Sequence, residues 1–339
     1  MRILVTGASG WIGSASVSEL LSAGHEVLGL ARSDAAAATI SSLGADPVAG
    51  SLEDLKGLRR ITARVEGVVH LGYVHDFSRM EVAAQTDFAA IEIFAAGLAG
   101  TGGPLLIASG TLGLATGRPA TELDRPDPAL HPRLRNATYT LDLANRGIRS
   151  MVVRFAPTVH GGDGDHGFAA VLSRIARERG ISAYLGDGLN RWSAVHRLDA
   201  AKLVQLAVDK APAGSVWHAV GEEGLATRDI AEALGQYHHV PVTSVPMDQA
   251  RAHFDWIGMF FGMDAPASNA ITRDRLGWSP SHPSLMQDIA AGHYPGRCSL
   301  RTPLPPLLME IRICVYSSPE PAASSALPWS RNWSKKVIA

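Results

Sequence analysis

Three glycines near the amino terminus are spaced so that backbone amides could lie against a phosphate group. Gly7, Gly10 and Gly13 form a G-x-x-G-x-x-G pattern directly after the apolar residues 3–5. Such a turn lets the main chain approach a pyrophosphate that a Cβ atom would hold away, and the amides that begin the following helix then face the phosphates. Glycine is also frequent in ordinary turns, but here the pattern lies between an expected strand and an expected apolar helix. It therefore predicts dinucleotide binding.

The end of the second expected strand indicates which dinucleotide is bound. In dinucleotide-binding folds a carboxylate at this position accepts hydrogen bonds from the adenosine ribose, whereas an arginine pairs with a 2′-phosphate. The chain has Ala31 here, followed by Arg32 and Ser33, and Asp34 is expected to be the N-cap of the next helix. A guanidinium suits a phosphate dianion and a hydroxyl adds a donor, although Arg32 could also be a solvated surface charge. We expect NADP(H) in preference to NAD(H).

Strands and helices alternate through the first half of the chain. Apolar segments predict strands at residues 2–6, 26–31, 47–52, 67–71, 104–109 and 150–155, with helices between them that include residues 14–23, 80–98 and 135–144. Strands separated by helices at this spacing form βαβ units and a parallel sheet. The sequence therefore predicts an α/β fold with a Rossmann-type, doubly wound parallel sheet, which residues 215–220 could extend by one strand.

Changes in composition and in the lengths of the expected loops and helices divide the chain into regions. We expect residues 1–160 to form the dinucleotide-binding domain, with residues 191–221 returning to it. Residues 161–190 and 222–294 have longer loops and shorter helices, and are expected to form a smaller substrate region. Its aromatic and methionine cluster at residues 256–263 is either core or a flexible apolar wall of a pocket. The Pro- and Ser-rich residues 295–339 are expected to be disordered.

Composition excludes several classes of protein. The net charge is −1, so the chain lacks the basic footprint of a nucleic-acid-binding protein. No apolar stretch reaches the roughly 18 residues that a membrane span requires. The only cysteines are Cys298 and Cys314, which leaves no disulfide framework and no cysteine-based zinc site. With no secretion signal expected, the sequence predicts a cytoplasmic protein that acts on a small molecule.

Four segments, in this order along the chain, resemble the extended short-chain dehydrogenase/reductases of the NAD-dependent epimerase/dehydratase family. Residues 5–13 resemble the family's T-G-x-x-G-x-[IL]-G turn, and residues 68–73 its V-H-L-A strand. Residues 154–161 are similar to R-P-x-x-V-Y-G, and residues 194–201 to V-H-V-x-D-x-A. The similarity runs from residue 1 to about residue 294.

The resemblance implies hydride transfer between a nicotinamide and a carbinol or carbonyl carbon. The family's contacts to the pyrophosphate, the 2′-phosphate, the adenine and the fourth strand map onto Gly7, Gly10, Trp11, Ile12, Gly13, Arg32, Ser33, Ser51, Leu52, Leu71 and Gly72. The family usually has aspartate where this chain has Ser51, so the adenine contact departs from the pattern there.

The family's acid–base pair is missing from this chain. The family supplies a tyrosine whose phenol is acidified by a lysine four residues later, on the same helix face, with a serine or threonine as second partner. None of the six tyrosines is followed by lysine at that spacing. We place Arg133 at the tyrosine position and expect no catalytic role for Tyr139. Ser109 and Thr111 are candidates for the hydroxyl partner, or else form ordinary strand-end hydrogen bonds.

Histidines offer a replacement, because an imidazole exchanges protons near neutral pH. Candidates are His75, beside Asp76, and the histidines of the loop at residues 160–166. That loop also has the composition of a metal site, but its glycines are more typical of a substrate loop, so we expect no metal.

Three functions stay open at this point. The first is an NADP(H)-dependent oxidoreductase acting on a small, fairly apolar alcohol or carbonyl compound. The second is a sensor or scaffold that binds NADP(H) without turnover. The third is a nucleotide-sugar epimerase or dehydratase.

Overall fold

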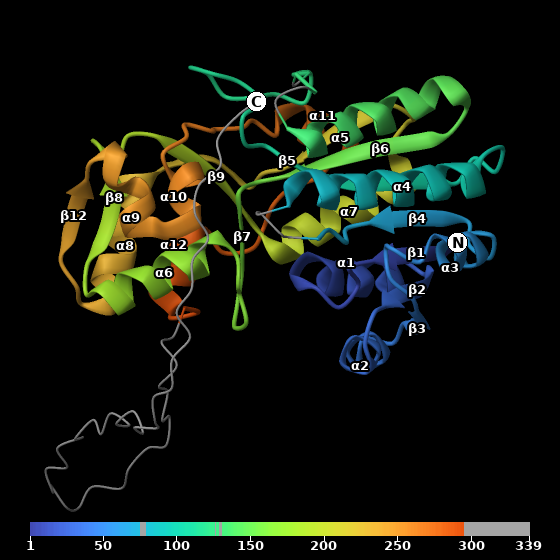
Figure 1. Cartoon of the computed structure of the whole chain (residues 1–339), viewed down its shortest axis with the longest axis horizontal. Helices are drawn as coiled ribbons and strands as arrows, with labels where there is room; N and C mark the ends of the chain where they lie inside the picture. Colours follow the sequence, from blue (N-terminus) through green and yellow to red (C-terminus); the bar gives the residue numbers. More distant parts are fainter. Residues whose placement is uncertain (75–78, 126, 129–130, 295–339) are drawn as a thin grey trace, which may run out of the picture. The chain divides into compact units, whose positions relative to one another are not determined.

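Seven parallel strands form the main sheet, in the order β10-β6-β5-β4-β1-β2-β3 (Figure 1). The computed structural model describes residues 1–74, 79–125, 127–128 and 131–294. The strands are β1 (Arg2–Thr6), β2 (Glu26–Ala31), β3 (Asp46–Ala49), β4 (Gly67–His70), β5 (Pro104–Gly110), β6 (Arg149–Phe155) and β10 (Ser215–Ala219). The winding reverses between β1 and β4, as in a Rossmann-type sheet. The predicted fold class is confirmed, and β10 is the strand that was expected to extend the sheet.

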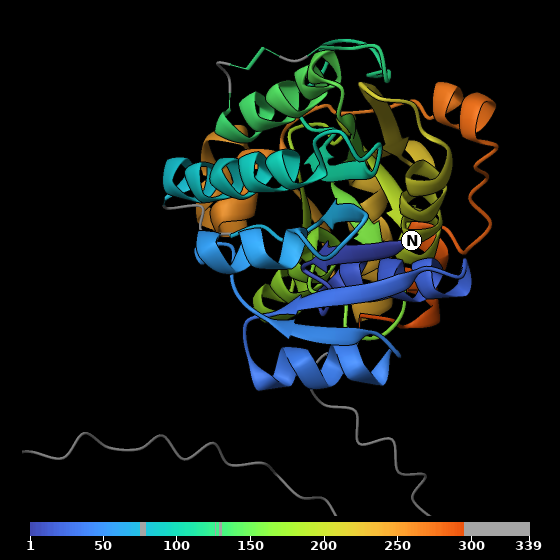
Figure 2. The ribbon, with the colours of Figure 1, turned by 90° about the vertical axis from the view of Figure 1, so that its right-hand side faces the viewer.

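Helices cover both faces of this sheet because successive strand residues point to opposite sides. One face carries α1 (Trp11–Ser22), α2 (Asp34–Ser42) and α7 (Arg197–Lys210), and the other carries α3 (Leu55–Thr62), α4 (Met80–Leu98), α5 (Pro132–Asp142) and the 3-10 helix η1 (Leu143–Arg146). In β1, Ile3 and Val5 belong to the first core, and Leu4 belongs to the second. Figure 2 shows α3, α4 and α5 (blue to green) side by side in one layer.

Several element boundaries differ from the prediction, and at two of them a polar side chain caps the following helix. β3 ends at Ala49 rather than at residue 52, since Asp54 accepts a hydrogen bond from the Gly57 amide (2.9 Å) and turns the chain into α3. α5 begins at Pro132 rather than at residue 135. The His131 ring accepts a hydrogen bond from the backbone there, and a proline suits the first helical position.

The N-cap of α2 is Ser33, so the prediction of Asp34 for this position is wrong. The Ser33 hydroxyl accepts a hydrogen bond from the Ala36 amide at 3.2 Å, while Asp34 is already the first helical residue. A serine with extended backbone can cap the helix itself, and Asp34 then lies in the first turn, where a carboxylate interacts favourably with the helix dipole.

The smaller region contains two further sheets. β7 (Thr158–His160), β9 (Arg191–His196) and β11 (Glu222–Ala226) form one in the order β11-β9-β7, and β8 (Ser182–Leu185) pairs with β12 (Val242–Val245) in the other. The helices here are α6 (Phe168–Arg179), α8 (Thr227–His238), α9 (Ala250–Phe254), α10 (Gly258–Phe261) and α12 (Leu285–Ala291), with the 3-10 turns η2 (Met247–Gln249) and η3 (Asp255–Ile257). α11 (Ala270–Leu276), expected in this region, instead packs against α7 and β10, because its buried Leu276 belongs to the core of the main sheet. Within residues 191–221, α7 and β10 pack into the larger layer, whereas β9 belongs to the small sheet.

The aromatic and methionine cluster divides between core and surface. Ile257 and Phe261 are buried in the core of the smaller region, whereas Met259 is 63% exposed. None of the described helices is long and apolar enough to cross a membrane. The tail that was expected to be disordered lies outside the described residues.

Candidate functional site

The glycine turn after β1 has no room for side chains. Gly7 has a φ of +68°, and a Cβ atom on it would lie 2.8 Å from the amide nitrogen of Gly72, just beyond β4. A Cβ atom on Gly13 would lie 1.9 Å from the carbonyl oxygen of Gly7. Gly10 is the N-cap of α1, so the free amides of the helix begin at this turn. The turn therefore makes a backbone cradle at the switch point between β1 and β4, and a pyrophosphate fits its shape and polarity.

The other residues assigned to a cofactor lie along the same edge of the sheet, because they follow the carboxyl ends of parallel strands. Trp11, Ile12, Leu71 and Gly72 are at the cradle, Arg32 and Ser33 follow β2, and Ser51 and Leu52 follow β3. Arg32 is exposed and has no carboxylate partner in the part of the chain that the structure describes. The Ser33 hydroxyl accepts one hydrogen bond as the N-cap, and its own proton remains able to bond a phosphate oxygen. Ser51 bonds Glu53 at 3.3 Å.

Trp11 connects the cradle to the small sheet. Its indole nitrogen donates a hydrogen bond to the carbonyl oxygen of Val159 in β7, at 2.8 Å. The Arg197 guanidinium lies 4.3 Å from the centre of the same indole, within cation–π range. The His166 ring packs edge-on against it at 6.1 Å. The nucleotide cradle is thereby held against the region that carries the expected substrate loop.

Ser109 and Thr111 are buried at the end of β5, with exposed fractions of 4% and 1%. The Thr111 hydroxyl lies 3.4 Å from the hydroxyl of Ser193 in β9, and the Thr111 amide donates to Phe155. Thr111 thus joins the main sheet to the small sheet. Both hydroxyls lie at the edge of the sheet where the cradle opens.

Arg133 lies at the start of α5 and packs against a tyrosine that follows β4. The guanidinium carbon is 4.3 Å from the centre of the Tyr73 ring, and one Nη atom donates to the carbonyl oxygen of Ala108 at 3.4 Å. Burial raises the pKa of the Tyr73 phenol, and the Arg133 charge opposes that rise. Sequence reasoning missed Tyr73 as a site residue. The signal that could have found it is an aromatic side chain one residue beyond Gly72, where the chain passes the cradle.

A buried chain of polar side chains supports this arrangement from below. The Thr6 hydroxyl bonds His70 Nδ1 at 2.7 Å and also accepts the Gly72 amide at 3.0 Å. The other ring nitrogen of His70 bonds Asp87, whose second oxygen accepts a hydrogen bond from Asn136 at 2.7 Å. Burial alone would raise the pKa of Asp87, but His70 and Asn136 lower it below its ordinary value. These hydrogen bonds join β1, β4, α4 and α5 beneath the site.

The histidines proposed as replacement acids have other surroundings. His160 is fully buried, and its Nδ1 lies 2.5 Å from Asp288 Oδ2, with Glu222 3.7 Å from its other nitrogen. Glu222 belongs to β11 and Asp288 to α12, so these contacts join β7 to both elements and His160 fits a structural role. His75 and Asp76 lie outside the described residues.

Three other side chains come close enough to suggest a metal site. The ligand atoms of His196, Asp199 and His282 lie within 4.8 Å of one another. The two imidazole rings stack at an angle of 9°, His196 Nδ1 accepts a hydrogen bond from the Leu198 amide, and the Asp199 carboxylate accepts from three donors. His196 Nδ1 is occupied by the Leu198 amide, and the Asp199 carboxylate accepts from residues 281 and 282, so the hydrogen bonds of this cluster fit the anchoring of the loop before α12.

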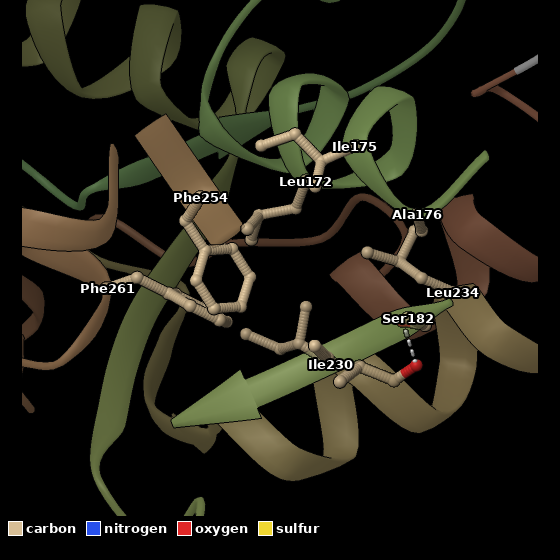
Figure 3. Close-up of a pocket in the computed structure, with 10 residues that line it drawn as sticks. Leu172, Ile175, Ala176, Ser182, Ile230, Leu234, Phe254 and Phe261 are labelled. Carbon is tan, nitrogen blue, oxygen red and sulfur yellow. Dashed lines mark hydrogen bonds between the residues drawn. The ribbon is translucent and has the colours of Figure 1, made fainter. Parts of the chain in front are cut away.

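An internal cavity in the smaller region is too small for a substrate. Its volume is about 10 Å³, room for no more than about one water molecule, and its walls are mostly apolar core side chains such as Leu172, Ile230 and Phe254 (Figure 3). Ligand pockets in proteins are larger by more than tenfold, of order 300 Å³ and above. The cavity is a packing gap.

Comparisons with known proteins agree with this geometry. The sequence model of the NAD dependent epimerase/dehydratase family matches residues 3–94. An uncharacterized protein of Schizosaccharomyces pombe is 45% identical over 87% of this chain and 100% of its own length. The 4-hydroxy-2-methyl-3-oxo-4-farnesyl-3,4-dihydroquinoline-1-oxide ketoreductase of Stigmatella aurantiaca is 26% identical over 74% of this chain and 78% of its own length. UDP-glucose 4-epimerase of Thermotoga maritima has the same fold, with a TM-score of 0.68 at 21% identity over 85% of this chain and 96% of that chain.

Proposed function

The chain belongs to the NAD-dependent epimerase/dehydratase family, and from this we propose that it is an NADPH-dependent oxidoreductase that reduces a small, apolar carbonyl compound. The observation that carries the proposal is the cradle in which Gly7 and Gly13 leave no space for a Cβ atom. When bound there, the nucleotide supplies a hydride at the edge of the sheet that also holds Ser109 and Thr111. The chain's own residues bind the nucleotide, orient the carbonyl substrate and provide a proton.

Residues beyond β2 support NADPH in preference to NADH. Arg32 is exposed and free of carboxylate partners among the described residues, so its guanidinium is available for a phosphate. Ser33 offers a hydroxyl proton next to it. No carboxylate ends β2, where Ala31 stands, so a ribose diol would lack its usual acceptor at this position.

An apolar substrate is supported by the aromatic residues of the smaller region. Phe168, at the start of α6, packs against Trp192 at 5.3 Å and Trp256 at 5.6 Å, and stacks on Phe260 at 6.0 Å. Of these, Phe168, Trp256 and Phe260 are only partly buried. The Stigmatella aurantiaca relative is named for a farnesylated substrate and a ketoreductase activity, which also favours reduction of an apolar ketone.

The test is a substrate screen that follows NADPH binding and NADPH oxidation separately. Binding is measured by the fluorescence of the reduced nicotinamide, and turnover by its absorbance across ketones and aldehydes of increasing apolar size. We expect binding of NADPH and turnover that improves with apolar substrates. Tight NADPH binding with no turnover across the whole panel would contradict the proposal and favour a sensor, the function that the missing tyrosine–lysine pair otherwise supports.

A further inference from the structure

We propose that Tyr73 is the catalytic proton donor of this site, with Arg133 as the positioning residue that takes the place of the missing lysine. The inference rests on the proposed function, since it assigns the acid for the reduction of a carbonyl group. The pair is assembled from the end of β4 and the start of α5, whereas a tyrosine–lysine pair four residues apart lies on one helix.

Tyr73 directly follows the residue that packs against the cradle. Gly7 of the cradle is packed so tightly against Gly72 that a Cβ atom would lie 2.8 Å from its amide nitrogen. Tyr73 is the next residue, so its phenol leaves the main chain beside the nucleotide site. The Gly72 amide is held by the Thr6 hydroxyl at 3.0 Å, which fixes the backbone from which Tyr73 projects.

Arg133 is anchored by its side chain and by its backbone. One Nη atom bonds the carbonyl oxygen of Ala108, the residue before Ser109, while the guanidinium faces the Tyr73 ring at 4.3 Å. The Arg133 amide is itself tied to the ring of His131, the N-cap of α5. The phenol, the guanidinium and the end of β5, which carries Ser109, therefore meet at one place on the edge of the sheet.

The electrostatic surroundings of Tyr73 suit a proton donor. Among the residues that the structure describes, the charged groups that act on Tyr73 are Arg133 from α5, and Asp87 and Glu81 from α4. Burial raises the pKa of the phenol, and the two carboxylates raise it further, so the phenol carries its proton at neutral pH and can donate it. Arg133 acts in the opposite direction and stabilises the phenolate that donation leaves behind. A guanidinium suits this place because it stays charged when buried, where a lysine readily loses its proton.

Reduction of the carbonyl group requires one hydride and one proton. A hydride adds to the carbonyl carbon as the C=O π bond breaks, and the oxygen takes the proton of the Tyr73 phenol to form the alcohol. NADPH provides the two electrons and leaves as NADP⁺. The Tyr73 phenolate, held beside the Arg133 cation, recovers its proton from water before the next cycle.

The first experiment compares Tyr73→Phe with Tyr139→Phe in the full chain. Tyr139 lies on α5, where its hydroxyl accepts a hydrogen bond from Arg146 at 3.2 Å and its ring packs on Phe88, so it is a matched control. Using the best ketone of the screen, we expect Tyr73→Phe to lower kcat about 100-fold or more, with the Kd for NADPH unchanged within about twofold. Tyr139→Phe should keep its turnover.

The second experiment separates an electrostatic role of Arg133 from a structural one. In the wild type, kcat should fall at high pH as the phenol ionises. In Arg133→Met this decrease of kcat should move to higher pH, because loss of the cation raises the pKa of Tyr73. In Arg133→Lys it should also move to higher pH, since a buried lysine loses its proton at high pH and then no longer opposes that rise. The pKa of the Tyr73 phenol should show the same order among these proteins without any substrate. It is measured by ultraviolet titration, in which the signal of the corresponding Tyr73→Phe variant is subtracted from that of each protein.

Each outcome decides between the proposals. If the wild type reduces ketones and Tyr73→Phe retains kcat within about threefold, Tyr73 is not the donor, although the proposed function stands. If the phenol titrates identically in wild type and Arg133→Met, the role of Arg133 is overturned. If the wild type binds NADPH and reduces nothing, the proposed function fails, and the proton donation fails with it.

Discussion

His70 Nε2 lies 3.0 Å from Asp87 Oδ1 in a buried contact that joins β4 to α4. Asp87 has no proton to give at neutral pH, so the imidazole nitrogen must donate this hydrogen bond. Since the other ring nitrogen faces Thr6, the contact transmits the position of α4 to the end of β1, where the glycine cradle begins. Buried hydrogen bonds therefore position the glycine cradle from beneath the carboxyl edge of the sheet.

Removal of the Asp87 charge should destabilise the fold. In Asp87→Asn an amide replaces the carboxylate that now accepts hydrogen bonds from His70 and Asn136. We therefore expect the free energy of unfolding to fall by about 2–4 kcal/mol. Glu92→Gln, on the exposed face of the same helix, should change it by less than about 0.5 kcal/mol. Denaturant unfolding at pH 7 measures both, and equal effects of the two substitutions would contradict the prediction.

Arg32 should determine the preference between the two nucleotides. Arg32→Ala removes a charge-assisted hydrogen bond to the 2′-phosphate, so the Kd for NADPH should rise roughly 10- to 100-fold while the Kd for NADH stays nearly unchanged. Arg64→Ala is the control, because Arg64 is exposed just before β4, at the opposite edge of the sheet. Fluorescence titration with both nucleotides provides the measurement. Equal NADPH affinity in wild type and Arg32→Ala would show that Arg32 is only a surface charge.

Gly13→Ala should abolish nucleotide binding. Its methyl group would lie 1.9 Å from the Gly7 carbonyl oxygen, and since both partners are backbone, the cradle itself must move. We expect the NADPH affinity to fall at least about 100-fold, because the amides no longer align with the pyrophosphate. Gly100→Ala controls for a general loss of stability: Gly100 has a φ of +75°, with open space around it. That variant should be less stable by about 1 kcal/mol and bind NADPH normally.

His218 should make the protein less stable in mild acid. Its ring donates to the Ser268 carbonyl oxygen and faces an Arg154 nitrogen at 3.4 Å. Burial lowers its pKa to about 4, with Arg154 adding to the effect and Glu122 opposing it. Below about pH 6.5 the unfolded chain binds a proton here that the folded protein does not, so protonation favours unfolding as the pH falls from about 6.5 to 4.

The size of this effect follows from the gap between the two pKa values. Up to about 3 kcal/mol of the free energy of unfolding should disappear across that window. His218→Gln removes the titrating group, so its stability should decline less steeply with falling pH than that of the wild type. Parallel profiles for the two proteins in denaturant unfolding would rule out His218 as the source.

The alternation of apolar strands and helices predicted the main sheet because each periodicity is local, and Gly7 and Gly13 marked the cradle because only glycine fits so close an approach of backbones. Helix ends were harder to predict. Ser33 and Asp34 are both good caps, and the choice between them depends on which one adopts extended backbone. The division of residues 191–221 between two sheets could not be predicted from the sequence either. It depends on the pairing of β9 with β7 and β11, which are not adjacent to it in the sequence.

By itself, the sequence determined the Rossmann-type fold, the glycine cradle, the arginine after β2 and the absence of a tyrosine–lysine pair. Only the tertiary structure decided what stands beside Arg133. Tyr73 and Arg133 are 60 positions apart, and they meet because β4 ends and α5 begins at the same edge of the sheet. The same holds for Thr6, His70, Asp87 and Asn136, whose hydrogen bonds cross four elements. Local periodicity carries no information about such pairs, because packing of the whole sheet brings them together.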